Sequence, residues 1–148
     1  GWKPHGSIEE TRAILKSFME EDETWAVVLR SNSQLLGSFG LHRDAMRGSE
    51  IKARALGYVL AEEAWGHGYA TEAAQRVLSF AFEEFGLELV SVCHFPFNAR
   101  SRRVIEKCGF RYEGTIRHAY RRYDNTVLDS CCYSIMREEY LALKENAQ

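Results

Sequence analysis

Apolar and polar residues change their spacing abruptly between Leu56 and Glu72. Residues Leu56–Leu60 form a short apolar run of strand length, and the regularity then breaks at Gly66-His67-Gly68. From Ala70 onward, apolar residues fall at positions 70, 74, 77, 78, 81, 82 and 85, which is one face of a helix. The pattern therefore predicts a strand that passes through a glycine turn into the N-terminus of a helix.

The same spacing rules predict the other elements. Ser7 and Glu10 form a capping-box signature, which begins a helix over Ile8–Glu20. The expected strands are Trp25–Leu29 and Gln34–Leu41, which pair as a hairpin, then Ile51–Leu60, Leu87–His94, Phe110–Ile116 and Val127–Met136. Polar connections are expected over His42–Glu50 and Arg117–Thr126.

Three further helices are expected. The helix after the glycine turn ends at Gly86, a short helix over Ala99–Cys108 begins at the N-cap Asn98, and a last one or two turns cover Arg137–Lys144. Strands and helices mixed along 148 residues indicate a single α/β domain over residues 1–148.

The glycine turn concentrates backbone N–H groups that have no helical partner. The first turn of a helix leaves such donors free, and the helix dipole adds partial positive charge there. Glycine has no Cβ to hold an anion away from the backbone, so the turn predicts a pyrophosphate site. A tight turn that needs glycine only for its dihedral angles is the alternative. Neither a Walker A loop nor a dinucleotide fingerprint fits, because no Lys follows and Thr71 replaces the third glycine.

Bulk composition excludes several classes of protein. The net charge of −2 gives no whole-chain signal for nucleic acid or a membrane surface, and no apolar run is long enough to cross a bilayer. The cysteines, Cys93, Cys108, Cys131 and Cys132, lack metal-ligand or secretory spacing, and the histidines do not complete a metal set with them. We expect a cytoplasmic protein without a metal ion.

Two blocks of sequence carry a family resemblance. The first is Trp65-Gly66-His67-Gly68-Tyr69-Ala70-Thr71-Glu72-Ala73, and the second is Asn98-Ala99-Arg100-Ser101 with Val104-Ile105-Glu106-Lys107 and Gly109-Phe110. Together they resemble the GNAT superfamily of N-acetyltransferases, in the branch of ribosomal-protein N-terminal (alanine/serine) acetyltransferases.

This resemblance implies a fold and a cosubstrate. The fold is a mixed, mostly antiparallel sheet flanked by helices, whose central strands, here Ile51–Leu60 and Leu87–His94, splay apart. Acetyl-CoA would enter the gap, with its pantetheine arm along the edge of the earlier strand. The family's N-terminal strand-helix unit is expected to be missing, since the chain begins at Gly1-Trp2-Lys3.

The resemblance and the positions of the residues together suggest candidate roles. The diphosphate would lie on Gly66, His67, Gly68, Tyr69, Ala70 and Thr71, a backbone N–H near Val59 or Leu60 would meet the oxyanion, and Asn98 would contact the pantetheine arm. Ile105 stands where many members carry a Tyr that protonates the departing thiolate, so Ser101 is expected to take that role. His94 is the candidate for relaying the proton of the amine through water. Arg76, Arg102 and Arg103 are weaker candidates for phosphate contacts.

The acceptor is expected to be a primary amine. An α-amino group has a pKa near 8 and is already partly neutral, whereas neutralising a lysine amine near 10.4 costs about 4 kcal/mol. Because no strong catalytic base is evident, a protein N-terminal α-amine is favoured. A small-molecule amine, such as a polyamine or an antibiotic, is the alternative.

Two non-catalytic functions stay open. Arg117-His118-Ala119-Tyr120-Arg121-Arg122-Tyr123 interleaves basic and aromatic residues, as in RNA-binding modules. A hairpin bordering the acceptor site explains the same residues. The chain could also bind acetyl-CoA without turning it over.

Overall fold

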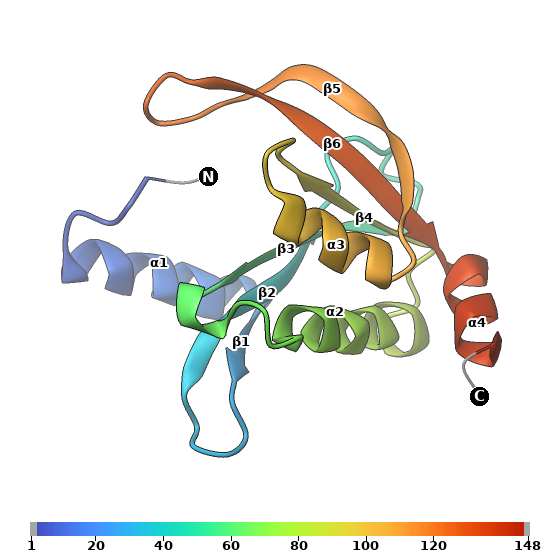
Figure 1. Cartoon of the computed structure of the whole chain (residues 1–148), viewed down its shortest axis with the longest axis horizontal. Coiled ribbons are helices and arrows are strands. Elements are labelled where there is room, and N and C mark those ends of the chain that lie inside the picture. The colour runs from blue at the N-terminus through green and yellow to red at the C-terminus, as the bar shows by residue number, and fades with distance from the viewer. Residues whose placement is uncertain (1–2, 147–148) are drawn as a thin grey trace.

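A six-stranded sheet forms the centre of the computed structural model, which describes residues 3–146 (Figure 1). The strand order is β1-β2-β3-β4-β6-β5, and the β3–β4 pair is parallel while the other pairs are antiparallel. The strands are β1 Thr24–Val28, β2 Leu35–Arg43, β3 Ala53–Leu60, β4 Leu89–His94, β5 Arg111–Arg121 and β6 Val127–Met136. The expected mixed, mostly antiparallel sheet is confirmed.

Helices flank this sheet, and two of them bring the candidate site together. They are α1 Ile8–Glu21, a short 3₁₀ turn at Glu62–Ala64, α2 Tyr69–Ser79, α3 Ala99–Lys107 and α4 Arg137–Asn146; α2 continues into a π-helical turn at Phe80–Glu84. Figure 1 shows α2 and α3 side by side across the sheet, with α4 beyond the far end of α2.

The hydrophobic core lies between the sheet and these helices. It is built from alternate strand residues and from one face of α2, its π-helical turn and α3, as the apolar spacing predicts. Its most deeply buried large side chains are Phe39, Phe82, Leu78, Ile105 and Ile135. Burial of these side chains fixes both α2 and α3 against the strands that carry the site.

The two central strands separate halfway along their length. The parallel pairing of β3 with β4 runs from Ala53 opposite Leu89 to Leu56 opposite Val92, and then it ends. Both strands continue, to Leu60 and His94. One edge of β3 is therefore left unpaired over its last residues, which is the predicted splay.

The structure moves several predicted boundaries and changes the geometry of one helical segment. Strand β2 runs on through Arg43 into the segment expected to be a loop, and β5 runs on to Arg121, so the polar connection after it is shorter than expected. The helical segment after the glycine turn changes to π geometry at Phe80, where α-helix was expected. Helix α1 begins at its capping box as predicted, with the Glu10 N–H bonded to Ser7, but none of its residues is buried. The prediction of a missing N-terminal strand-helix unit falls at Gly1-Trp2, which lies outside the described residues.

A buried polar cluster anchors the loop after β2. The Asp44 carboxylate accepts hydrogen bonds from Ser91 Oγ at 2.7 Å and from Arg47 at 2.8 Å, and Arg47 also donates to Glu113 on β5 at 2.7 Å. Burial raises the pKa of Asp44, but the bonds from Ser91, Met46 N–H and Arg47 outweigh it and hold that pKa below its ordinary value. The cluster ties this loop to β4 and β5.

Candidate functional site

The glycine turn between β3 and α2 has the backbone geometry that an anion requires. Gly66 and Gly68 have φ of +80° and +85°, a region in which residues with a Cβ are strained. A Cβ built on either glycine would meet no atom within 4 Å, so it would project into open space. That space would admit a close-approaching ligand, while the positive φ values are also those of a turn that needs glycine for its dihedral angles alone.

The N–H groups of this turn have no acceptor. Among residues 3–146, the backbone donors of residues 66–71 make no hydrogen bond, and the first bond of this helical segment is Glu72 N–H to Gly68 O at 3.1 Å. Gly68 is the N-cap of α2 and offers no side-chain acceptor to these donors. The predicted residues Gly66, His67, Gly68, Tyr69, Ala70 and Thr71 therefore form one patch of free donors at the positive end of a helix.

The edge of β3 beside the gap supplies further free backbone groups. Ala61 N–H donates to Leu36 O of β2, and strand alternation then directs the N–H of Val59 toward β2 as well. The N–H groups of Tyr58 and Leu60 face the gap. Of the two residues expected to offer an oxyanion donor, the register favours Leu60 over Val59.

Helix α3 brings the second sequence block to the other side of this gap. Asn98 is its N-cap, and its side-chain oxygen accepts the Ser101 N–H at 3.0 Å. The Ser101 hydroxyl makes no bond to the helix backbone. It lies 2.7 Å from the hydroxyl of Tyr58 on β3, so the two hydroxyls connect the splayed strand to the helix.

His94 ends β4 at the gap and is 7% exposed. Its Nδ1 lies 2.8 Å from the Phe95 carbonyl oxygen, which can only accept, so Nδ1 carries the proton in the neutral ring. Its Nε2 is left as an acceptor and lies 3.5 Å from the Tyr133 hydroxyl. The ring is thus held in the tautomer that a proton acceptor needs, inside the protein rather than at its surface.

One arginine lies beside the glycine turn, and two of the arginines predicted to contact phosphate do not. Arg100, in the first turn of α3, stacks over the Trp65 ring at 4.7 Å, and Trp65 Nε1 donates to Leu60 O at 3.0 Å. This arrangement brings a guanidinium next to the glycine turn. Two of the predicted arginines form ion pairs instead, Arg76 with Glu84 and Arg102 with Glu106.

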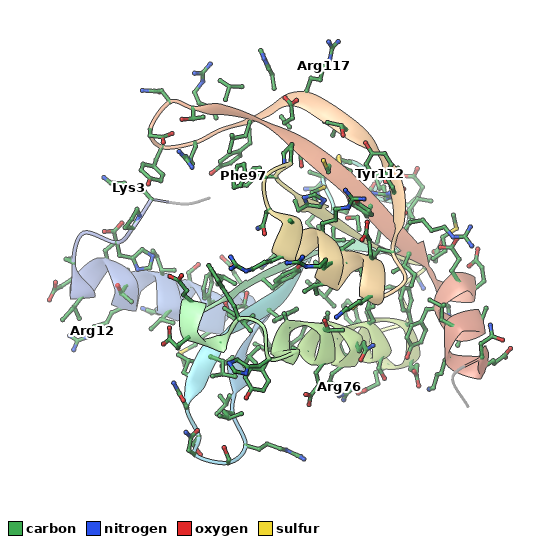
Figure 2. All side chains as sticks on the ribbon, in the orientation of Figure 1. Lys3, Arg12, Arg76, Phe97, Tyr112 and Arg117 are labelled. Atoms are coloured by element: carbon green, nitrogen blue, oxygen red, sulfur yellow. The ribbon has the colours of Figure 1, made fainter. Side chains whose placement is uncertain are left out.

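The basic and aromatic residues near position 117 lie elsewhere. Most of them are part of β5, and Figure 2 shows Arg117 projecting from the β5–β6 hairpin on the opposite side of the molecule from Arg76 on α2. Arg122 is paired with Asp124, and the His118 N–H donates to Asp129. These acidic partners reduce the positive potential that an RNA backbone would need.

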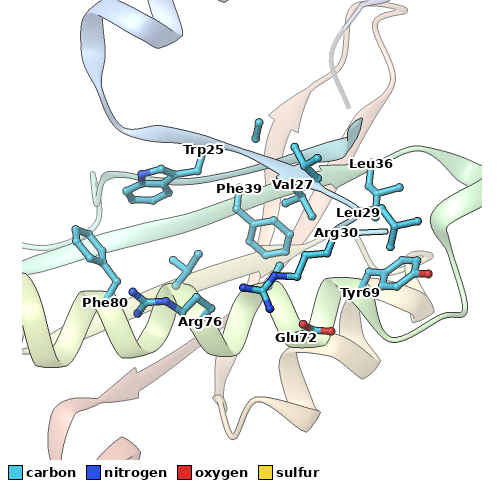
Figure 3. A pocket seen from close by; sticks show the side chains of 14 residues that line it. Trp25, Val27, Leu29, Arg30, Leu36, Phe39, Tyr69, Glu72, Arg76 and Phe80 are labelled. Carbon is cyan, nitrogen blue, oxygen red and sulfur yellow. The ribbon is translucent and has the colours of Figure 1, made fainter. Parts of the chain in front are cut away.

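A cavity of about 480 Å³ opens between α2 and the β1–β2 hairpin (Figure 3). Its lining is mainly apolar, with Trp25, Phe39 and Phe80 among its walls and charged residues such as Arg30 at its rim. Of the residues predicted for the site, its lining includes Tyr69 and Arg76. The cavity is therefore a neighbour of the glycine turn rather than the gap itself.

Tyr58, Trp65 and Arg100 are site residues that the sequence did not single out for a role. One feature of the sequence pointed to Tyr58. It lies two residues from both Leu56 and Leu60 in the strand, so its side chain lies on the same buried face as theirs. A phenol there needs a hydrogen-bond partner. The identity of that partner is set by tertiary packing.

The described residues carry neither a metal cluster nor a membrane span. Within residues 3–146, no group of three or more His, Cys, Asp or Glu is placed to hold a metal ion. In the same range, no helix combines the length and the apolar character that crossing a bilayer requires. The cytoplasmic location stays a prediction.

Comparison with known proteins gives a consistent family. Residues 1–111 match the profile of the acetyltransferase (GNAT) domain. The chain is 29% identical over 136 residues to the uncharacterized N-acetyltransferase YoaA of Bacillus subtilis (strain 168), covering 88% of this chain and 75% of that protein. It is 34% identical over 112 residues to the putative ribosomal N-acetyltransferase YdaF of the same organism, covering 74% and 57%. The crystal structure of a GNAT-family acetyltransferase from Bacillus anthracis superposes with a TM-score of 0.79 at 29% identity, covering 89% and 76%.

Proposed function

This chain belongs to the GNAT acetyltransferase family, and from that premise we propose that it acetylates the α-amino group of a protein N-terminus by direct attack on acetyl-CoA. The chain is an N-acetyltransferase, and acetyl-CoA is the acetyl donor of its family. The patch of free N–H donors over residues 66–71, beside an unpaired strand edge, is the observation that carries the proposal.

The residues present fit coenzyme A. The N–H groups of residues 66–71 would bind its diphosphate, and the open space at Gly66 and Gly68 would admit the phosphate oxygens. The unpaired edge of β3 would pair with the amides of the pantetheine arm. Acetyl-CoA would supply the activated acetyl group, while side chains of this protein and water would move the protons.

Three groups at the gap would perform those steps. The Leu60 N–H would stabilise the negative charge that develops on the carbonyl oxygen. The Ser101 hydroxyl would protonate the sulfur as the carbon–sulfur bond breaks. The His94 Nε2, the ring nitrogen without a proton, lies 3.5 Å from the Tyr133 hydroxyl and would accept the proton of the amine through water.

An imidazole as the proton acceptor favours an α-amine. An ammonium group with a pKa near 8 is already partly neutral, whereas a lysine near 10.4 adds about 3 to 4 kcal/mol of deprotonation cost at neutral pH. The relative YdaF, 34% identical over its matched region, is named a putative ribosomal N-acetyltransferase. Its name supports a protein N-terminus as the acceptor class.

An amine panel tests the acceptor. Thiol release from acetyl-CoA would be measured with a peptide that has a free N-terminal Ala or Ser and no Lys, and with the same peptide carrying a blocked N-terminus and one Lys. We expect turnover with the first peptide and little with the second, and mass spectrometry would locate the acetyl group. Spermidine and an aminoglycoside complete the panel, and faster turnover with either would replace the protein acceptor by a small-molecule amine.

Replacement of Ser101 tests the mechanism. Ser101→Ala should lower kcat by about 100-fold, the lower end of the range for a general acid, while the Kd for acetyl-CoA measured by calorimetry stays the same. Ser17→Ala is the matched control, because Ser17 is a helical serine on α1 whose hydroxyl bonds only Glu21 in that helix. An unchanged kcat in Ser101→Ala would leave Ser101 as a structural residue.

A further inference from the structure

Two hydroxyls from distant parts of the chain meet across the gap. Tyr58 Oη, on the splayed end of β3, lies 2.7 Å from Ser101 Oγ, on the first turn of α3. We propose that Tyr58 is a positioning residue for acetyl transfer, which directs the Ser101 hydroxyl at the departing sulfur and resupplies its proton. This inference rests on the proposed function and adds a residue to it.

In the proposed role, Tyr58 is the donor in this pair. Its hydroxyl has two acceptors within reach, Ser101 Oγ at 2.7 Å and the Ser101 carbonyl oxygen at 3.4 Å. Either hydroxyl can donate in the shorter contact, and we assign the phenol hydrogen to it because the longer contact is at the limit of an O–H···O bond. Once Ser101 Oγ accepts this hydrogen, its own hydrogen is free to point into the gap.

Both partners are held in place by packing. The Tyr58 ring stacks on Phe39, with ring centroids 4.8 Å apart and planes 11° from parallel, and Phe39 is 1% exposed. Ser101 is fixed by the bond from its N–H to the Asn98 side chain. Because both hydroxyls are already in position, they need to move little when negative charge develops on the sulfur. Such preorganisation is the condition for effective electrostatic catalysis.

The proton balance closes through this pair, His94 and water. As the amine nitrogen bonds the acetyl carbon, the carbon–sulfur bond breaks, the sulfur takes the proton of Ser101 Oγ, and the amine proton passes through water to His94. Ser101 takes the phenol proton of Tyr58, and the proton held by His94 returns through water to Tyr58. Burial of Tyr58 raises its phenol pKa above the ordinary value of 10, so the phenol enters each cycle protonated.

A purely structural role for the same contact makes different predictions. If the hydrogen bond between Tyr58 and Ser101 only held β3 and α3 together, it would set the width of the gap. Removing the Tyr58 hydroxyl would then weaken acetyl-CoA binding whether or not Ser101 kept its hydroxyl. A positioning role acts through Ser101 alone. Loss of the Tyr58 hydroxyl should then lower kcat, leave the Kd for acetyl-CoA unchanged, and have no further effect once the Ser101 hydroxyl is gone.

The test is a double-mutant cycle with Tyr58→Phe and Ser101→Ala. Tyr58→Phe keeps the ring on Phe39 and should lower kcat about 10-fold, which is what one hydrogen bond at the upper end of the usual range supplies. Ser101→Ala should lower kcat about 100-fold. The double variant should match Ser101→Ala. Ser101→Thr, which keeps a hydroxyl, should retain most of kcat and the 10-fold effect of Tyr58→Phe.

Thermal unfolding without ligand supplies a readout that is independent of activity. Tyr58→Phe and Ser101→Ala should each lower Tm by about 2–4 °C, and the double variant should lower it by less than the sum of the two. Tyr112→Phe is the control, because Tyr112 Oη bonds Thr115 at 2.6 Å on the exposed strand β5. It should leave kcat unchanged.

Each outcome decides between the two roles. An additional 10-fold loss of kcat from Tyr58→Phe in the Ser101→Ala background, an unchanged kcat in Tyr58→Phe, or a weakened Kd at constant kcat would overturn the positioning role while the acetyltransferase proposal stands. Wild-type protein that releases no thiol with any amine of the panel would overturn both.

Discussion

The glycine turn offers the sharpest test of how this protein holds its cosubstrate. Gly68→Ala changes one atom at a residue with φ of +85°, in the middle of the free N–H donors. Two effects are expected. The added Cβ strains the backbone, and it also projects into the space that we assign to the diphosphate.

The two effects have different magnitudes. A residue with a Cβ in the left-handed region costs about 1–2 kcal/mol, which lowers Tm by about 3–8 °C in a domain of this size. A charge-assisted hydrogen bond is worth about 1.5–3 kcal/mol, so displacing the phosphate from one N–H should raise the Kd of coenzyme A by about 10- to 150-fold.

A matched control separates strain from binding. Gly86, which follows the π-helical turn at the other end of that helix, has φ of +74° and equally open space around a built Cβ. Gly86→Ala should therefore cost about the same Tm while leaving the Kd of coenzyme A unchanged. Calorimetry with coenzyme A and with dephospho-coenzyme A, which keeps the diphosphate, would measure both variants. Equal Kd values for Gly68→Ala and Gly86→Ala would refute the assignment of the diphosphate to this turn.

Two further predictions follow from pKa values. The pKa of Asp44 is lower in the folded than in the unfolded protein, so its contribution to stability is present above about pH 4 and is lost as pH falls through the folded pKa. Asp44→Asn should thus lower the free energy of unfolding by about 3 kcal/mol at pH 7 in urea titrations, with a smaller difference at pH 3; an equal difference at both pH values would contradict this. Cys93 is an exposed residue, but desolvation of its sulfur and the contact with Cys132 at 3.0 Å raise its pKa to about 12, so iodoacetamide at pH 8 should alkylate Cys93 roughly 50-fold more slowly than free cysteine. Cys132→Ala should speed that alkylation, and a rate equal to that of free cysteine in the unmodified protein would show that the thiol is not suppressed.

The acceptor assignment depends on the proton acceptor rather than on the fold. GNAT enzymes with one architecture act on different amines, so the sheet and its gap do not choose among them. In this protein the candidate proton acceptor is His94. Its side chain is buried, and its Nδ1 is hydrogen-bonded to the Phe95 carbonyl oxygen. The amine panel therefore tests a property of this site, and its result does not change the assignment of the family.

The sequence by itself determined the features that depend on a few neighbouring residues. Glycines at 66 and 68 between a strand and a helix require left-handed dihedral angles and leave amides free, and both are found at the predicted residues. The capping residues Ser7 and Asn98 begin α1 and α3 as expected, because a cap bonds an N–H three residues along the chain. Two motifs with matching secondary structure were enough to identify the family.

Only the tertiary structure decided which groups face one another across the gap. The pairing of β3 with β4 ends at Leu56, and the partners Tyr58 and Ser101 are 43 residues apart in sequence. Strand register also chose Leu60 over Val59 as the free donor, since a shift of one residue reverses every amide. Such contacts arise from the packing of whole elements against a common core, and no local pattern in the chain encodes that packing by itself.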